Sequence, residues 1–165
     1  MPGFYYLNVT LHVLAAMLWL GGMFFFALVG APVLRRVEPP SLRAALFADL
    51  GRRFRGVGWG AIGVLIATGV VNLYYRGLLR ADVWGSGAFW GTGLGRALGW
   101  KLGAVVVMVS VSAIHDFHLG PAASRLSAGS PAAARARRNA AWLARFNALV
   151  GLFLIAAAVR LARGG

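Results

Sequence analysis

The sequence predicts an all-α integral membrane protein in which four helices form a bundle. Of its 165 residues, 59% are hydrophobic and 13% are charged, and the mean hydropathy is +0.71. Soluble domains average about 45–50% apolar and about 25% charged residues. Four apolar runs, at residues 5–34, 57–75, 98–119 and 140–162, are each about as long as a membrane span or longer. Because backbone groups find no water in lipid, these runs are predicted to be helices, and residues 1–165 to form a single domain.

The first run, residues 5–34, is interpreted as a true span and not as a signal peptide. The segment MPGFYY at its start contains no Lys or Arg, and the run is longer than the apolar region of a signal peptide. The charged segment RRVEPPS, residues 35–41, ends it.

The connections between the runs predict further elements. Residues 41–51, SLRAALFADLG, have apolar residues at helical spacing with Ser41 in position to cap the N-terminus, and they predict a short interfacial helix. Residues 83–100 are rich in Gly and Trp, and these aromatics suit the membrane interface. Ser130 and Pro131 suit the N-cap and first position of a helix, so the fourth span is expected to begin with a basic, water-exposed extension.

The basic residues predict the orientation in the membrane. Six arginines lie in the first connection and five in the third, whereas the second connection has four basic residues and the tail has two. Since Lys and Arg accumulate on the cytoplasmic side, both termini are expected outside the cytoplasm. The membrane that the protein spans is expected to be the inner (plasma) membrane of a bacterium. The net charge of +13 is spread between the spans and forms no separate basic domain. Anionic lipids are therefore the expected partners, and nucleic acids are not.

Polar side chains within the spans collect at two depths, and polar groups at membrane depth usually face the bundle interior and mark function. The outer group comes from all four spans and comprises Asn8, His12, Thr68, Asn72, Lys101 and Arg160. Within it, the residues of the pairs Asn8–His12 and Thr68–Asn72 are four apart, so each pair shares a helix face. The inner group lies where the third span ends and the fourth begins, and comprises His115, Asp116, His118, Arg145 and Asn147.

His12 has two interpretations. It is either hydrogen-bonded to a neighbouring helix or a ligand of haem iron, a role that suits a neutral imidazole. Ala15, Ala16, Trp19 and Gly22 follow on the same helix face, and Trp19 is a further candidate contact of a cofactor. The small residues there leave space for a flat group but also permit close helix packing. If haem binds, Arg76 and Arg160 are expected to pair with its propionates.

Lys101 and the two histidines of the inner group also have two interpretations each. Lys101 is the one lysine among 17 basic residues. Its ammonium either extends to the lipid headgroups or serves as a salt-bridge partner for a ligand carboxylate or as a titratable amine. His115 and His118, three residues apart, either mark the point where the span leaves the membrane or form a second metal or haem site.

Four segments carry a resemblance to a known family. They are LHVLAAMLWLGGMFF, RFRGVGWGAIGVLIATGVVN, GWKLGAVVVMVSVSAIHDFH and ARFNALVGLFLIAAAVRLAR. In this order they resemble the spans of the copper resistance protein D (CopD) family and of the related HemJ-type protoporphyrinogen oxidases. The CopD resemblance implies copper movement across the inner membrane. The HemJ resemblance implies haem b, with a first-span His and a third-span Lys that fall on His12 and Lys101. After the first span, ALVGAPVLRR departs from the HemJ pattern, and the second span is of the CopD kind.

Three functions remain open from the sequence. The first is a membrane b-type haem protein for electron transfer or porphyrin handling, with His12 as axial ligand; its enzymatic form would be a haem-dependent oxidoreductase of the protoporphyrinogen oxidase type. The second is copper transport, although Cu(I) prefers Cys and Met ligands and the chain has no Cys and four Met. The third is a cofactor-free scaffold subunit. A redox partner and homo-oligomerisation are compatible with the first.

Overall fold

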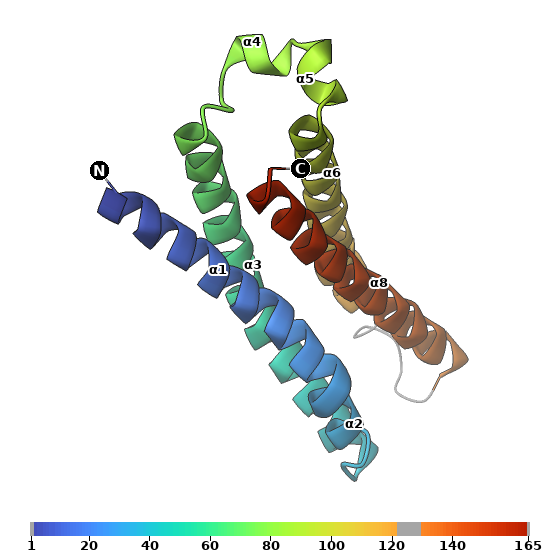
Figure 1. Cartoon of the computed structure of the whole chain (residues 1–165). Coiled ribbons are helices and arrows are strands. Elements are labelled where there is room, and N and C mark those ends of the chain that lie inside the picture. The colour runs from blue at the N-terminus through green and yellow to red at the C-terminus, as the bar shows by residue number, and fades with distance from the viewer. Residues whose placement is uncertain (1, 122–129, 165) are drawn as a thin grey trace.

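The computed structural model describes residues 2–121 and 130–164, and within them the chain is helical and contains no strand. Four helical segments are long and apolar enough to cross a membrane: Gly3–Leu34, Pro40–Tyr75, Gly93–Leu119 and Ala134–Ala162. The predicted all-α membrane protein with four spanning helices is thus confirmed (Figure 1).

The first spanning segment consists of α1 (Pro2–Phe25), a π-helical turn η1 (Phe26–Gly30) and α2 (Ala31–Leu34). The widened turn ends two residues before Pro32. Proline has no N–H to donate to the carbonyl four residues earlier, and its ring crowds that carbonyl. We attribute the π turn to this local conflict, because widening the helix relieves it without ending the helix.

The second spanning helix, α3, is longer than predicted and runs without interruption from Pro40 to Tyr75. The separate interfacial helix expected over residues 41–51 is therefore wrong, as is the cap at Ser41: Pro39 is the N-cap residue and Pro40 begins the helix. Proline is tolerated there because the first-turn N–H groups have no helical acceptor. The carboxylate of Asp49 pairs with Arg52 at 3.1 Å and with Arg53 at 3.0 Å, and these pairs support the helix across the expected break.

Two short helices, α4 (Ala81–Trp84) and α5 (Gly87–Gly91), connect α3 to α6 (Gly93–Ala113). Thr92 caps α6, because its side chain accepts a hydrogen bond from the Gly95 N–H at 3.0 Å. This cap starts the helix five residues before the predicted span. Before α4, the guanidinium of Arg80 donates to both oxygens of Asp82 and holds the pKa of that carboxyl below its ordinary value.

The third span ends in a second π-helical segment, η2 (Ile114–Leu119), two residues before Pro121. Its position relative to the proline repeats that of η1, and the same physical account applies. The fourth segment, α8 (Pro131–Ala162), begins at the predicted Pro131 and includes the basic extension ahead of the apolar run.

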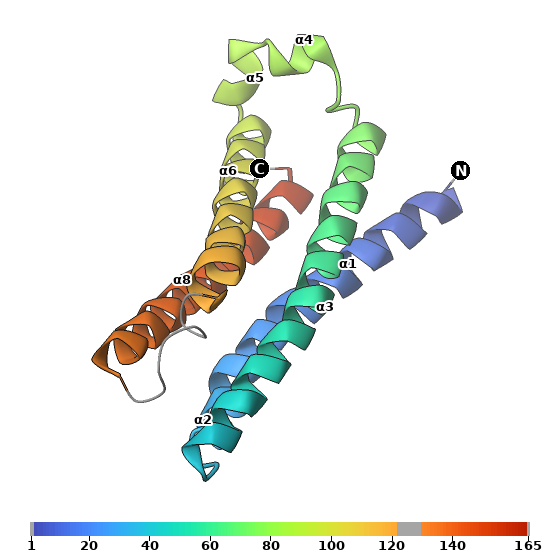
Figure 2. The ribbon, with the colours of Figure 1, turned by 180° about the vertical axis from the view of Figure 1, so that it is seen from behind.

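The four spanning segments form two antiparallel hairpins, in which α1 packs mainly on α3 and α6 mainly on α8. Figures 1 and 2 show both chain ends on the side of the molecule that carries α4 and α5, which we call the terminal end. The opposite side carries α2, and we call it the α2 end. The assignment of the α2 end to the cytoplasm stays a prediction from the arginines.

One hydrophobic cluster joins the two hairpins at mid-depth. Its buried members come from α1, α3 and α6, and half-buried side chains of α8 pack against them: Trp19, Leu20, Ala61, Ile62 and Met108, with Val150 and Leu154. A hydrogen bond of 2.9 Å from Trp59 Nε1 to Asp116 Oδ2 adds a polar contact between α3 and η2. The outer faces are apolar and open, with Leu28 71% exposed, as expected for surfaces that meet lipid.

Candidate functional site

A polar cluster connects α1 to α3 toward the terminal end. The Asn8 side-chain amide donates to the carbonyl of Thr68 at 3.1 Å and to Oδ1 of Asn72 at 2.9 Å. One turn further, Nδ1 of His12 lies 2.7 Å from Oγ1 of Thr68. We call Asn8, His12, Thr68 and Asn72 the α1–α3 polar cluster. It forms because both i,i+4 pairs face the same interhelical seam.

The hydrogen bonds of this cluster determine the tautomer of His12. The single hydroxyl proton of Thr68 is donated to the carbonyl of Val64 at 2.6 Å. The hydroxyl oxygen must therefore accept from His12, which places the proton on Nδ1. In the neutral imidazole this leaves the lone pair on Nε2; the ring also lies within hydrogen-bonding range of the carbonyl of Leu65, which is an acceptor and cannot donate to that lone pair. A nitrogen in this state is a metal ligand or a proton acceptor.

The other predicted residues of the outer group lie on α3, α6 and α8. Lys101 is half-buried on α6, near enough to His12 and to Arg76 for electrostatic interaction, and it makes no hydrogen bond or ion pair among the described residues. Arg76 ends α3, and its Nη1 donates to the carbonyl of Leu161 on α8 at 3.0 Å. Arg160 is exposed, and its side chain has no partner in the described structure. We call Arg76, Lys101 and Arg160 the outer cations, and they come from the end of α3, from α6 and from α8.

Trp19 lies apart from the α1–α3 polar cluster. It is 5% exposed and belongs to the hydrophobic cluster that joins the hairpins. Its ring packs beside Gly58 of α3, where an added Cβ would lie 3.8 Å from Trp19 Cδ1. Trp19 also forms part of the wall of a cavity toward the α2 end.

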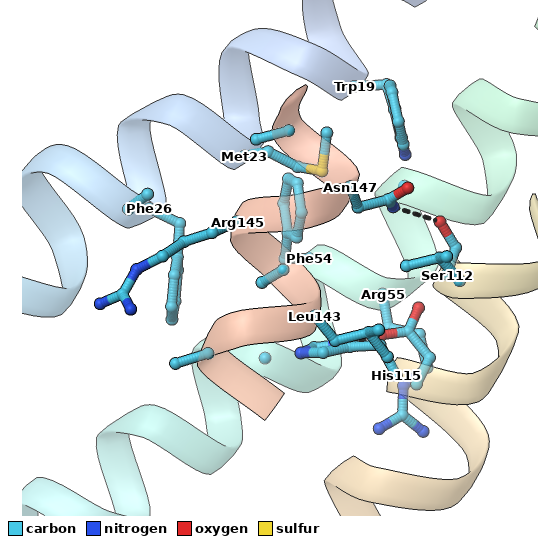
Figure 3. A pocket seen from close by; sticks show the side chains of 18 of the residues that line it. Trp19, Met23, Phe26, Phe54, Arg55, Ser112, His115, Leu143, Arg145 and Asn147 are labelled. Atoms are coloured by element: carbon cyan, nitrogen blue, oxygen red, sulfur yellow. Dashed lines mark hydrogen bonds and ion pairs between the residues drawn. The ribbon is translucent and has the colours of Figure 1, made fainter. Parts of the chain in front are cut away.

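This cavity has a volume of about 210 Å³ and is bounded by side chains from all four spanning segments (Figure 3). Its polar wall includes His115, whose Nδ1 lies 2.9 Å from Asp116 Oδ1, and Asn147, whose amide donates to Ser112 Oγ at 2.9 Å. Sequence reasoning had found Asp116 and Asn147 by depth, but it missed Arg55 and Ser112, which only helix packing brings to this wall.

The two predicted histidines His115 and His118 differ in their surroundings. His115 contributes to the cavity wall, whereas His118 is exposed and does not. Among the described residues, no group of three or more His, Asp or Glu side chains is arranged to hold a metal ion. The candidate binding groups of the cavity wall are therefore its arginines and Asn147.

Replacing Asn8 by alanine is expected to destabilise the α1–α3 hairpin by about 1–2 kcal/mol. The change removes two interhelical hydrogen bonds, and such bonds are worth about 0.6 kcal/mol on average in a membrane bundle and about 1.7 at most. The loss is measurable as a shift in denaturant-induced unfolding in mixed micelles. Thr10→Ala, at an exposed position on the same helix, is the matched control, and equal stability of the two variants would contradict the assigned role of Asn8.

Comparison with known proteins gives two matches. The family model described as copper resistance protein D matches residues 48–161, a range that includes Thr68, Asn72, Lys101 and His115 but not His12. A protein of Aquifex aeolicus (strain VF5), described as an uncharacterized protein, is 32% identical over 159 residues and covers 96% of this chain and 95% of its own length. No solved structure matches the chain.

Proposed function

Because the chain belongs to the copper resistance protein D family, we propose that it handles copper in the membrane and that His12 binds the metal ion. The observation that carries the proposal is the free lone pair on His12 Nε2, which the hydrogen bond from Nδ1–H to Thr68 leaves available. Imidazole is a suitable ligand for copper. With copper as cargo, the protein supplies a binding position on the α1–α3 hairpin, near Lys101 of the other hairpin.

The surroundings of His12 resemble those of metal-binding histidines. Such residues usually donate their second ring N–H to an oxygen, which orients the ring and raises its basicity. Here Thr68 accepts that proton, and Thr68 is itself held by Val64. Asn8 binds the adjacent carbonyl of Thr68 and keeps the two helices in register. The ring edge lies over Gly69, where an added Cβ would lie 3.7 Å from Cε1.

Lys101 favours a transit position over a storage site. Its ammonium interacts electrostatically with His12, and a positive charge near an imidazole lowers the affinity of that imidazole for a cation. Passage of an ion requires binding that is strong enough for entry and weak enough for release. The positive charge of Lys101 beside His12 would weaken copper binding, which is consistent with that balance.

A second candidate is a b-type haem protein, and the outer cations favour it. Lys101 and Arg76 lie within electrostatic range of each other, and together they suit a ligand that carries carboxylates. In this candidate, His12 would hold the iron, and Lys101 and Arg76 would pair with the propionates. The 210 Å³ cavity does not include His12, so it does not support this candidate. Bound haem would supply one-electron chemistry at its iron.

Replacement of Lys101 by leucine separates the two candidates, because they predict changes of opposite sign. For copper, loss of the neighbouring positive charge is expected to raise the Cu(I) affinity about tenfold, equivalent to about 1.4 kcal/mol. For haem, loss of a propionate partner is expected to lower haem occupancy. Cu(I) affinity is measured by competition with a chromogenic chelator, and haem by the Soret band of the purified protein.

Arg96→Leu is the control for this experiment, because Arg96 is an exposed cation on the same helix and donates to the carbonyl of Gly91. It is expected to change neither copper affinity nor haem content. A wild-type protein that is colourless and shows no measurable Cu(I) affinity in the competition assay would contradict both candidates and favour the scaffold subunit.

A further inference from the structure

We propose that the cavity toward the α2 end is a binding site for the headgroup of an anionic phospholipid, in which a phosphate is accompanied by a hydroxyl, as in phosphatidylglycerol. The proposal concerns a different part of the molecule from His12 and does not depend on copper. It rests on unpaired polar groups in the cavity wall, on the sign of the charge there and on the size of the space.

Two buried polar atoms of the cavity wall have no hydrogen-bond partner within the described residues. One is Oδ1 of Asn147, a residue that is only 4% exposed. Its amide N–H already donates to Ser112, as the dashed line in Figure 3 shows. The other is Nε of Arg55. An unpaired buried acceptor or donor costs about 1–3 kcal/mol, so a ligand that supplies one donor and one acceptor here is favoured.

The charge of the wall favours an anion. Three arginines, Arg35, Arg55 and Arg145, line the cavity, and Asp116 is the carboxylate among the lining residues. Both oxygens of Asp116 are already occupied, one by Trp59 Nε1 and the other by His115 Nδ1. Arg55 has no ion pair in the described structure, and its guanidinium lies 5.9 Å from the ring of Phe117. Guanidinium groups match phosphate in geometry and charge.

The size and the remaining wall match a headgroup with the start of its chains. A volume of about 210 Å³ corresponds to about seven water molecules at roughly 30 Å³ each. This is enough for a phosphate and a few carbon atoms and is below the size of a drug-like ligand. The other walls are apolar and include Met23, Phe26 and Phe54. A phosphate would meet the arginines, and a headgroup hydroxyl would donate to Asn147 Oδ1.

The test is the thermal unfolding of the purified, metal-free protein in neutral detergent with three additives. They are short-chain phosphatidylglycerol, short-chain phosphatidylcholine and glycerol 3-phosphate. We expect phosphatidylglycerol to stabilise the wild type in a saturable way and phosphatidylcholine not to do so. Equal stabilisation by glycerol 3-phosphate would support the same site with a free anion as its occupant. Equal stabilisation by phosphatidylcholine, or no response to either anion, would overturn the proposal.

Variants assign the response to the cavity. The apparent affinity for phosphatidylglycerol is expected to fall at least tenfold in Arg55→Gln and in Asn147→Leu. Arg145→Gln is a third variant in which misfolding is not expected, because this side chain is exposed, and it too should bind more weakly. Arg52→Gln is the matched control, since Arg52 lies on the same helix as Arg55 but pairs with Asp49 outside the cavity. A response that is unchanged in all three cavity variants would overturn the proposal.

Discussion

Replacing His12 by alanine is expected to lower the Cu(I) affinity of the purified protein at least a hundredfold. Loss of an outer-shell partner of a metal-binding histidine typically costs 10–100-fold in affinity, and the proposed ligand itself should cost no less. The measurement is competition with a chromogenic Cu(I) chelator, in parallel with copper tolerance of cells that produce each variant. If haem is the ligand instead, the same substitution removes the Soret band.

Thr68→Val tests whether the orientation of the imidazole matters. The substitution keeps the shape of the side chain but removes the acceptor of the His12 Nδ1–H, and we expect a 10–100-fold loss of Cu(I) affinity.

His118→Ala is the control for His12→Ala, because this exposed histidine lies outside both the α1–α3 polar cluster and the cavity. Undiminished copper binding in His12→Ala, with the loss appearing in His118→Ala, would contradict the proposed site.

Replacing Gly95 by alanine is expected to destabilise the protein by about 3 kcal/mol or more, at the upper end of the range for overpacking. An added Cβ would collide with the backbone carbonyl oxygen of Phe89 and lie 2.9 Å from the Cα of Trp90. Backbone atoms cannot move aside as a side chain can, so α5 must shift away from the start of α6. The Thr92 cap, which requires the Gly95 N–H, would be disturbed as well.

The effect of Gly95→Ala is measured as a lower midpoint of thermal unfolding. Gly103→Ala is the control on the same helix, because nothing lies within 4 Å of an added Cβ there. Alanine has the higher helix propensity, by about 0.8–1.0 kcal/mol in water, so Gly103→Ala is expected to be neutral or mildly stabilising. Equal midpoints for the two variants would contradict the close contact between α5 and α6.

The sequence determined the class of this protein and the number of its spanning helices. Lipid permits only segments that satisfy their own backbone hydrogen bonds, so four long apolar runs imply four helices whatever their contacts. The start of α8 was also readable, because Pro131 has a local preference for the first helical turn. Asn8, His12, Thr68 and Asn72 were selected by depth for the same reason: a polar side chain in lipid needs a partner.

The tertiary structure decided the features that depend on how the helices are rotated and paired. Spacing along α1 does not reveal that His12 meets Thr68, and so it does not determine the tautomer that frees Nε2. The continuity of α3 across Gly51 was also not predicted, although the exposed pairs of Asp49 with Arg52 and Arg53 that support it there lie within a single helix turn. The cavity brings Arg55 of α3 together with Asn147 of α8, two residues on different hairpins. Contacts between hairpins arise from the packing of whole helices, and a periodicity within one segment carries no information about that packing.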